Sequence, residues 1–137
     1  MDTKQVIIMR KFPNLRTGKY CAQAAHASMS FLTKYGNVYH PNHCHEEAEF
    51  AIDLVGDFWE EVEHWLNDSF KKIVCYVNTE EELDELYQKA LDNGLIAHMI
   101  TDNGTTEFNG VPTKTAIAIG PHWDSKFEGI TDHLPLL

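Results

Sequence analysis

Four short runs of apolar residues, rich in valine and isoleucine, restrict the fold of this chain more than any other feature. They cover residues 5–10, 72–77, 95–100 and 115–119, and the first reads Gln-Val-Ile-Ile-Met-Arg. Runs of this length and composition are typical of strands, and helical patterns separate most of them. Strands that alternate with helices indicate a layered α/β domain with a partly parallel sheet. With 137 residues and no linker or repeat, the whole chain (1–137) is expected to form one domain.

Residues 17–35 are expected to form the first helix. Alanine is frequent between residues 17 and 30, which favours helix, and Gly36 with the following Asn is expected to end it. At about 100° per residue, Lys19, Gln23 and His26 fall on one side of this helix. An ammonium, an amide and an imidazole in a row form either a solvated polar face or the wall of a site. The spacing alone leaves both interpretations open.

A second helix is expected at 46–66, where large apolar residues recur every three or four positions. Gly56 marks a possible break in it, and residues 39–45 before it are expected to be a loop. The positions that carry this pattern are Phe50, Leu54, Phe58, Val62 and Trp65.

Thr79 and Glu82 form a capping box that predicts the start of a third helix, which Asn93-Gly94 closes. Its buried face is expected to hold Leu83, Leu86, Tyr87, Ala90 and Leu91. Gly120-Pro121 is expected to end the fourth strand, and a short last helix is expected at 125–133, with Phe127 and Ile130 buried.

Charge is distributed unevenly along the chain. The net charge is −10, yet residues 1–45 hold six of the eleven basic residues and only one acidic residue. One face of the molecule can therefore be basic although the whole is acidic, or the charges mix again in the fold. No apolar run approaches the roughly 20 residues that cross a bilayer, and the N-terminus carries no signal-peptide pattern. Three widely spaced cysteines argue against a disulfide scaffold and favour a cytoplasmic location.

The loop after the third strand, residues 101–112, is the first candidate site. Asp102 opens it, followed by hydroxyl side chains and glycine. If the first and third strands are parallel neighbours, Lys19 and Asp102 face each other across one crevice at the carboxyl ends of the strands. A carboxylate beside an ammonium stays ionised and can orient or deprotonate a water. The alternative is that Asp102 only caps its own loop.

A second candidate site lies in residues 40–45. Three imidazoles and a thiol within six residues could bind zinc, through His40, His43, Cys44 and His45. No second ligand pair stands at a characteristic distance, so unpatterned surface histidines explain the segment better, and no metal site is predicted. His64 and His98 are expected to be structural.

Several short motifs follow one another along the chain with specific spacings. They are Lys4 to Arg10, Gly18-Lys19 with Ala22-Gln23 and His26-Ala27, Lys72-Ile73-Val74, Glu81-Glu82-Leu83, Asp102-Asn103-Gly104-Thr105-Thr106, Thr115 to Pro121 and Ile130 to Leu134. In this order they resemble the type-two peptidyl-tRNA hydrolases over nearly the whole chain, apart from residues 36–64. The resemblance implies a single three-layer α/β domain with a four-stranded mixed β-sheet flanked by helices on both faces.

The same resemblance implies hydrolysis of the ester that joins a peptide to the 3′ ribose of tRNA. The substrate would be peptidyl-tRNA, the reaction would need no metal or cofactor, and the enzyme would often be a homodimer. Matched residue by residue, the family's proposed active-site positions fall on Lys19, Asp102, Thr106 and Thr115, with Gln23 and His26 beside them. The catalytic residues are therefore expected to be Lys19, His26, Asp102, Thr106 and Thr115. Substrate binding is expected at Arg10, Arg16, Gln23, Gly104 and Thr105.

These roles agree with the chemistry of the side chains. Asp102 or His26 can activate a water, and Lys19 can hold the phosphate-ribose end or stabilise an oxyanion. The two threonines, Thr106 and Thr115, can position the water or the ester carbonyl. The phosphate backbone would meet the basic first 45 residues.

The chain also departs from the family pattern. Phe12-Pro13 stands where the family has Asp-Leu, Thr105 where it has Arg, and Glu107 where it has Gln. One extra residue lies between Glu107 and Thr115. Losing a cation and gaining an anion bears on tRNA affinity more than on the hydrolytic residues. Two alternatives to the hydrolase therefore stay open: a non-catalytic tRNA- or protein-binding relative on the same fold, and a metal-binding regulator that uses the histidine-rich segment.

Overall fold

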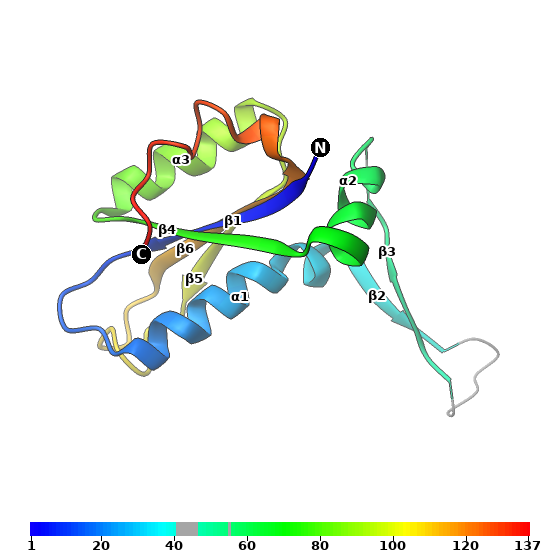
Figure 1. Cartoon of the computed structure of the whole chain (residues 1–137). Helices are drawn as coiled ribbons and strands as arrows, with labels where there is room; N and C mark the ends of the chain where they lie inside the picture. The colour runs from blue at the N-terminus through cyan, green and yellow to red at the C-terminus, as the bar shows by residue number, and fades with distance from the viewer. Residues whose placement is uncertain (41–46, 55) are drawn as a thin grey trace.

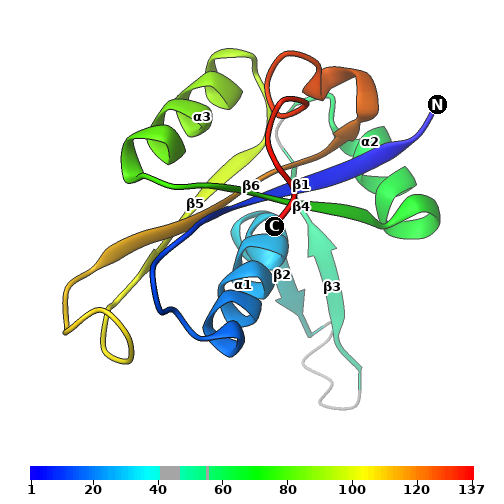
Figure 2. The ribbon, with the colours of Figure 1, turned by 60° about the vertical axis from the view of Figure 1, so that its left-hand side comes forward.

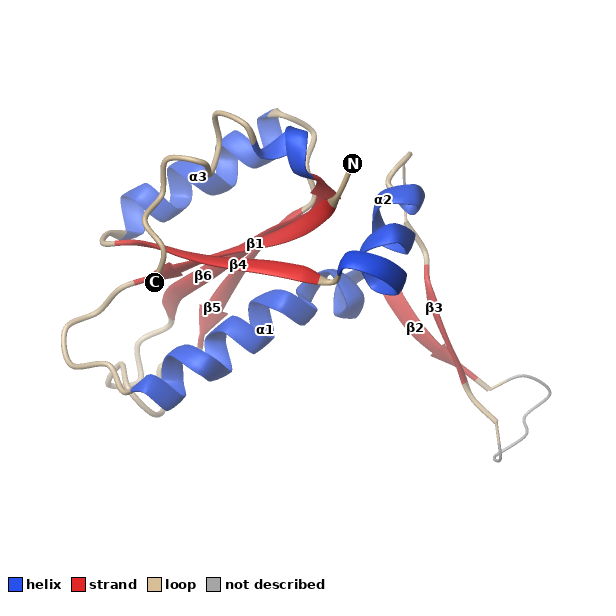
Figure 3. Cartoon of the chain, viewed as in Figure 1, coloured by secondary structure: helices blue, strands red, loops and turns tan. Residues whose placement is uncertain are grey.

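A four-stranded mixed sheet forms the centre of the computed structural model, which describes residues 1–40, 47–54 and 56–137 (Figures 1 and 3). Its strand order is β4 (Lys71–Val77), β1 (Thr3–Arg10), β6 (Thr113–Trp123), β5 (Ala97–Asp102). β1 and β4 are parallel, whereas β6 runs antiparallel to both of its neighbours. The predicted α/β fold with a mixed sheet is confirmed.

Two long helices cover opposite faces of this sheet, α1 (Thr17–Tyr35) on one and α3 (Glu80–Asp92) on the other (Figure 2). Successive side chains of a strand point to opposite faces, so β1 contributes to both cores. Val6 and Ile8 pack in the cluster of α3, while Ile7 and Met9 pack in the cluster of α1. The predicted three layers therefore follow from a central strand that is apolar on both faces.

The start of α3 confirms the predicted capping box. The Thr79 hydroxyl accepts the Glu82 N–H at 3.1 Å, and the Glu82 carboxylate reaches back to the N–H of Asn78, also at 3.1 Å. Three of the five residues expected on the inner face are buried, namely Leu83, Leu86 and Ala90. Leu91 is 41% exposed, so its predicted burial is wrong.

The helix predicted at 46–66 is wrong in its first half. After α1 the chain forms a hairpin of β2 (Gly36–Tyr39) and β3 (Glu49–Ile52), which projects beyond the sheet in Figure 1. The Phe50 ring lies against Gly36, where a side chain on the glycine would collide with it, and this contact favours strand pairing over the helical period. Residues 41–45 of the predicted loop, and residue 46 at the start of the predicted helix, lie outside the described residues.

The second half of that segment is helical. α2 (Trp59–His64) begins after Gly56, which has a φ of +106°, and continues into a π-helical turn, η2 (Trp65–Ser69). Val62 and Trp65 are buried there with Phe31 of α1, so the helical period in this half does report a core.

β6 is longer than predicted, because Gly120-Pro121 does not end it. The register between β1 and β6 shifts at this point, and pairing resumes where His122 lies opposite Lys4. A proline is tolerated in a strand at such an irregularity, since no ladder N–H is required of it. The last helix predicted at 125–133 is only a 3-10 turn, η3 (Asp124–Phe127), although Phe127 and Ile130 are buried as expected.

The outer edge of β4 is covered by the last residues of the chain, which the sequence did not suggest. Tyr76 donates its N–H to the carbonyl of Pro135 at 3.1 Å, and Leu137 donates to the carbonyl of Val74 at 3.0 Å. Cys75 and Leu136 form an antiparallel bridge between these bonds. Figure 1 accordingly places the C-terminus beside β4. No helix among the described residues is long and apolar enough to cross a membrane.

His98 on β5 predicts how stability depends on pH. Its side chain is buried against the ring of Tyr35, and burial, aided by the charge of Lys34, lowers the pKa of His98 from 6.5 to about 4. Below pH 6.5 His98 is therefore protonated in the unfolded chain but stays neutral in the folded protein, and the free energy of unfolding falls until about pH 4. At 1.36 kcal/mol per unit the loss amounts to about 3 kcal/mol.

We expect His98→Leu to remove most of this loss, as measured by urea unfolding at pH 7 and pH 4.5. The matched control is His133→Leu, because the His133 side chain is 62% exposed. If the two variants lose the same stability on acidification, burial of His98 does not carry the effect.

Candidate active site

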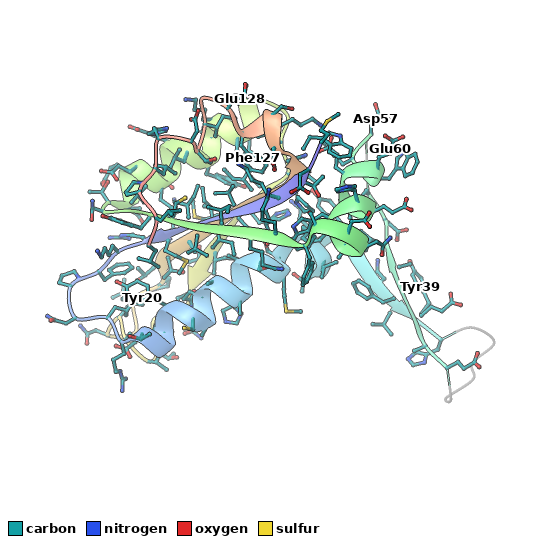
Figure 4. The ribbon with its side chains drawn as sticks, in the orientation of Figure 1. Tyr20, Tyr39, Asp57, Glu60, Phe127 and Glu128 are labelled. Carbon is teal, nitrogen blue, oxygen red and sulfur yellow. The ribbon has the colours of Figure 1, made fainter. Side chains whose placement is uncertain are left out.

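The start of α1 brings Lys19 to the loop that follows β5. The hydroxyl of Tyr20 accepts the N–H of Phe12 at 2.8 Å and donates to the carbonyl of the same residue at 3.0 Å. These two bonds hold the connection between β1 and α1 against the first turn of the helix, where Figure 4 labels Tyr20. The register of α1 over the sheet is fixed there, and with it the position of Lys19.

Lys19 and Asp102 form the centre of the site. The ammonium donates to Oδ2 of Asp102 at 2.7 Å and to the hydroxyl of Thr106 at 2.9 Å. The Lys19 and Asp102 side chains are 14% and 11% exposed, so solvent screens this pair far less than an ordinary surface ion pair. The predicted meeting of the two charges is confirmed.

Gln23 joins this pair to the buried side of β6. Its amide nitrogen donates to Oδ2 of Asp102 at 3.0 Å, and its amide oxygen accepts the hydroxyl of Thr115 at 2.6 Å. Both Gln23 and Thr115 are buried, so each amide atom has one defined partner. Thr115 is the extra residue where the pairing of β5 with β6 shifts between Ile100 and Thr101, a bulge that aims its side chain at the amide.

The second oxygen of Asp102 shapes the loop itself. Oδ1 accepts the N–H of Gly104 at 2.8 Å, so the capping role considered for Asp102 exists alongside its pairing with Lys19. Gly104 has a φ of +83°, and a side chain on it would collide with the backbone of Val111. Thr105 is tied to Asn103 by its N–H and its hydroxyl, which leaves it on the outer side of the loop.

The hydrogen bond from Lys19 is the main cause that lowers the pKa of Asp102 below its usual 3.8, with smaller contributions from Gly104 and Gln23. Desolvation of the carboxyl group opposes these effects. Asp102 is therefore an anion at neutral pH. A weak base of this kind suits holding a cation and a water in place, and the ammonium beside it can stabilise an oxyanion.

The other predicted residues lie around this centre without joining it. Arg10 donates to the carbonyl of Lys114 at 3.2 Å and lies over the Phe12 ring, 4.5 Å from its centroid. Arg16 is 79% exposed and pairs with Glu107, Nη2 lying 2.6 Å from Oε1. His26 is exposed on the next turns of α1, at the rim of a hollow of about 760 Å³ between α1 and β5.

Two aromatic residues near the site were missed from the sequence. Phe12 and Phe108 pack against each other with ring centroids 4.9 Å apart, and the ammonium of Lys19 lies 5.9 Å from the centroid of Phe108. Phe12 stands in the sequence only as a departure from a family pattern, and Phe108 lies within a polar loop, so no local signal marked them.

One premise of the predicted crevice is wrong. β1 and β5 run in the same direction but are not neighbours, because β6 lies between them. α1 spans the gap, since the cluster beneath it contains Ile7 of β1, Ala116 of β6 and Ile100 of β5. Lys19 therefore reaches Asp102 across the face of the sheet.

The candidate metal site cannot be placed, because His43, Cys44 and His45 lie outside the described residues. Within the described ranges, no group of three or more His, Cys, Asp or Glu side chains could hold a metal ion. Cys21 and Cys75 are free thiols, the first exposed and the second buried.

Comparison with known proteins gives one consistent result. The sequence model of the family described as Peptidyl-tRNA hydrolase PTH2 matches residues 3–137. A protein named peptidyl-tRNA hydrolase from Methanocaldococcus jannaschii is 34% identical over 98% of this chain and 99% of its own length. Another from Nanoarchaeum equitans is 35% identical over 97% of each chain. A solved structure of a protein of unknown function from Agrobacterium tumefaciens shares the fold, with a TM-score of 0.53 at 12% identity, over 100% of this chain and 98% of the other.

Proposed function

Since this chain belongs to the peptidyl-tRNA hydrolase PTH2 family, we propose that it cleaves peptidyl-tRNA with Lys19, Gln23, Asp102, Thr106 and Thr115 as its catalytic centre. The observation that carries the assignment is the largely buried Lys19–Asp102 pair, 2.7 Å apart, at the end of β5. An ion pair costs desolvation energy, so one kept at a strand end beside a glycine loop favours a catalytic over a purely structural role.

The reaction adds water to the ester carbonyl carbon and breaks the bond from that carbon to the ribose 3′ oxygen. The 3′ oxygen leaves with one proton of the water, the peptide leaves as a carboxylate, and the second proton passes to solvent. In our proposal Asp102 orients the attacking water, and the ammonium of Lys19 stabilises the negative charge that develops on the carbonyl oxygen. Gln23 holds Asp102 in register with Thr115, and Thr106 shares the Lys19 ammonium.

The general base is either Asp102 or His26. Asp102 is favoured for positioning water because two side-chain donors already fix its Oδ2. His26 makes no contact with this cluster among the described residues, and lies on the rim of the neighbouring hollow.

The tRNA is proposed to approach the end of the molecule where α1 begins. Arg10, Lys11 and Arg16 lie on and after the end of β1, close to Lys19. The acidic helix α2 lies near the other end of α1 in Figure 1, so its exposed residues Glu60 and Glu63 belong to a different part of the surface. This separation supports a basic face within an acidic protein.

We expect Glu107→Gln to strengthen tRNA binding. In the wild type the carboxylate of Glu107 pairs with Arg16, with Nη2 and Oε1 2.6 Å apart. Replacing the carboxylate by a neutral amide frees the guanidinium to bind a phosphate. KM for peptidyl-tRNA is expected to fall about threefold at low salt, and the slope of log KM against log salt to rise by roughly one, the value for one added phosphate contact.

Glu85→Gln is the matched control, because it removes one exposed negative charge from α3 on the far face of the sheet. Equal effects of the two substitutions would mean that net charge, and not the release of Arg16, governs binding.

The assay that tests the function is release of peptide from purified N-acetyl-aminoacyl-tRNA with a chelator present. Turnover under these conditions supports the metal-free hydrolase. tRNA binding without ester cleavage at high enzyme concentration would support the non-catalytic relative instead, and activity lost with chelator would support a metal-dependent role. The cytoplasmic location and the homodimer implied by the family resemblance stay proposals, the second to be tested by light scattering.

A further inference from the structure

The two edges of the central sheet are treated differently. Residues 135–137 cover the edge of β4 with main-chain hydrogen bonds, as described above. β5 forms the opposite edge, and no strand among the described residues pairs with its outer side. Proteins commonly cover or interrupt exposed edge strands because their free N–H and C=O groups invite pairing. An open edge strand beside a proposed catalytic centre is therefore a candidate site for pairing with an extended part of the substrate.

The direction of the free groups follows from the pairing with β6. The carbonyl of Ile96 accepts the N–H of Gly120 at 2.8 Å, so the main-chain groups of Ile96 face β6. Alternation along the strand turns those of His98 and Ile100 the same way and those of Met99 outward. Burial changes along the strand as well: residues 95–98 are buried, whereas Met99 and Ile100 are half-buried and Thr101 is exposed.

The hollow of about 760 Å³ lies along this open edge. Met99, Ile100 and Thr101 form one side of it, and α1 forms the other, from Ala25 to Thr33. Three strand residues span about 10 Å and nine helical residues about 13 Å, which is room for roughly three residues of extended peptide. No residue that lines it carries a fixed charge, and Met29 gives it an adaptable apolar wall.

We propose that the open edge of β5 binds the peptide part of peptidyl-tRNA as an added strand. The inference rests on the proposed function, because it takes the ester to lie at Asp102, directly after Thr101. The peptide then runs parallel to β5 with its C-terminal residue at Asp102 and earlier residues beside His26 and Thr33. The bound tRNA extends from the ester toward the start of α1.

Main-chain pairing would let one site bind peptides of different sequence. Nascent peptides share only their backbone, and strand addition takes its affinity from backbone hydrogen bonds, while side-chain pockets supply selectivity. The uncharged hollow offers space without selecting one side chain. The two parts of the substrate therefore bind to surfaces of different charge: the anionic RNA binds at the basic end of α1, and the neutral peptide backbone binds along β5.

The first experiment varies the substrate and leaves the enzyme unchanged. N-acetyl-Ala-Ala-Ala-tRNA is expected to show a KM at least fivefold below that of N-acetyl-Ala-tRNA, with similar kcat. N-methylation of one peptide amide at a time is expected to raise KM at alternate positions only, because a strand presents every second N–H to its neighbour. Changing Ala to Val or Ser in the tripeptide is expected to matter less than twofold.

The second experiment blocks the far end of the hollow. Thr33 is exposed and lines it, so Thr33→Trp is expected to raise KM for the tripeptidyl substrate at least threefold and to leave N-acetyl-Ala-tRNA unchanged. Gln88→Trp is the control, since it places the same ring on the exposed side of α3, across the sheet.

The results separate the two proposals. Cleavage of N-acetyl-Ala-tRNA without any dependence on peptide length or N-methylation would overturn strand addition and leave the hydrolase intact. A dimer joined through β5 would also overturn strand addition, because the edge would then bind a second copy of the chain. Such a dimer would be recognised if light scattering showed a dimeric wild type and a monomeric Thr101→Pro variant. Failure to cleave either substrate would remove the proposed function itself.

Discussion

Asp102→Asn is expected to lower kcat/KM for peptidyl-tRNA by about a hundredfold, and Lys19→Ala by at least tenfold. Asparagine keeps an acceptor for the N–H of Gly104, so the loop retains its shape, but the anion that holds Lys19 at 2.7 Å and Gln23 at 3.0 Å is lost. Groups placed where charge develops in a transition state typically contribute 10²–10³ in rate. The measurement is initial-rate hydrolysis of N-acetyl-aminoacyl-tRNA.

Asp92→Asn provides the control, because Asp92 is an exposed carboxylate at the end of α3, on the far face of the sheet. Unfolding curves of all variants separate lost catalysis from lost structure. Turnover that stays at the wild-type level in both Asp102→Asn and Lys19→Ala would remove the proposed catalytic centre.

Glu61→Ala is expected to lower the free energy of unfolding by about 3 kcal/mol while leaving the catalytic centre in place. Glu61 lies on α2, and its buried carboxylate binds the ring of His122 at 2.6 Å, the N–H of Trp123 at 3.2 Å and the ammonium of Lys126. Removing it leaves two buried donors without an acceptor, each of which costs about 1–3 kcal/mol.

The ring of His122 is fixed at both nitrogens. Nε2 accepts the N–H of Ile96 at 2.8 Å, so Nδ1 carries the proton and donates to Glu61. Burial lowers the pKa of His122, the hydrogen bond and charge of Glu61 oppose this shift, and the charge of Lys126 adds to it. The network therefore joins α2, β6 and the start of β5 with one neutral imidazole.

Urea unfolding at pH 7.5 measures the effect of Glu61→Ala. Glu60→Ala is the control on the same helix, since the Glu60 side chain, labelled in Figure 4, is exposed and is expected to change stability by less than about 0.5 kcal/mol. A loss for Glu61→Ala no greater than that for Glu60→Ala would mean that the buried network contributes little.

Local patterns in the sequence predict much of the sheet and two of the helices. β1, β4 and α3 carry β-branched runs or capping residues whose effect is local, and they appear within one or two residues of their expected bounds. The hairpin of β2 and β3 was missed because it depends on a contact between Phe50 and Gly36, far apart in sequence, that a helical period cannot report. The strand order could not be predicted either, because it also depends on contacts between residues far apart in sequence.

The candidate site shows the same division. The stripe of Lys19, Gln23 and His26 on α1 is visible in the sequence, and two of its three members meet Asp102. His26 lies seven residues after Lys19, about 10 Å further along α1, so it lies beyond the short loop that holds Asp102 and Thr106. The pairing of Arg16 with Glu107 is likewise a contact between distant residues.

The bulge at Thr115 has a consequence for how the molecule tolerates change. The register of β6 is set by β1, where Met9 lies opposite Ala116, and not by the connection from Asp102 to Thr113. The bulge lies inside β6, between Lys114 and Ala116, so it takes up the mismatch with β5 while Ala116 keeps its register with β1 and Thr115 keeps its bond to Gln23. Thr106 lies inside this loop and has to reach Lys19, so a change of loop length is expected to disturb Lys19 through Thr106 before it disturbs Gln23 through Thr115.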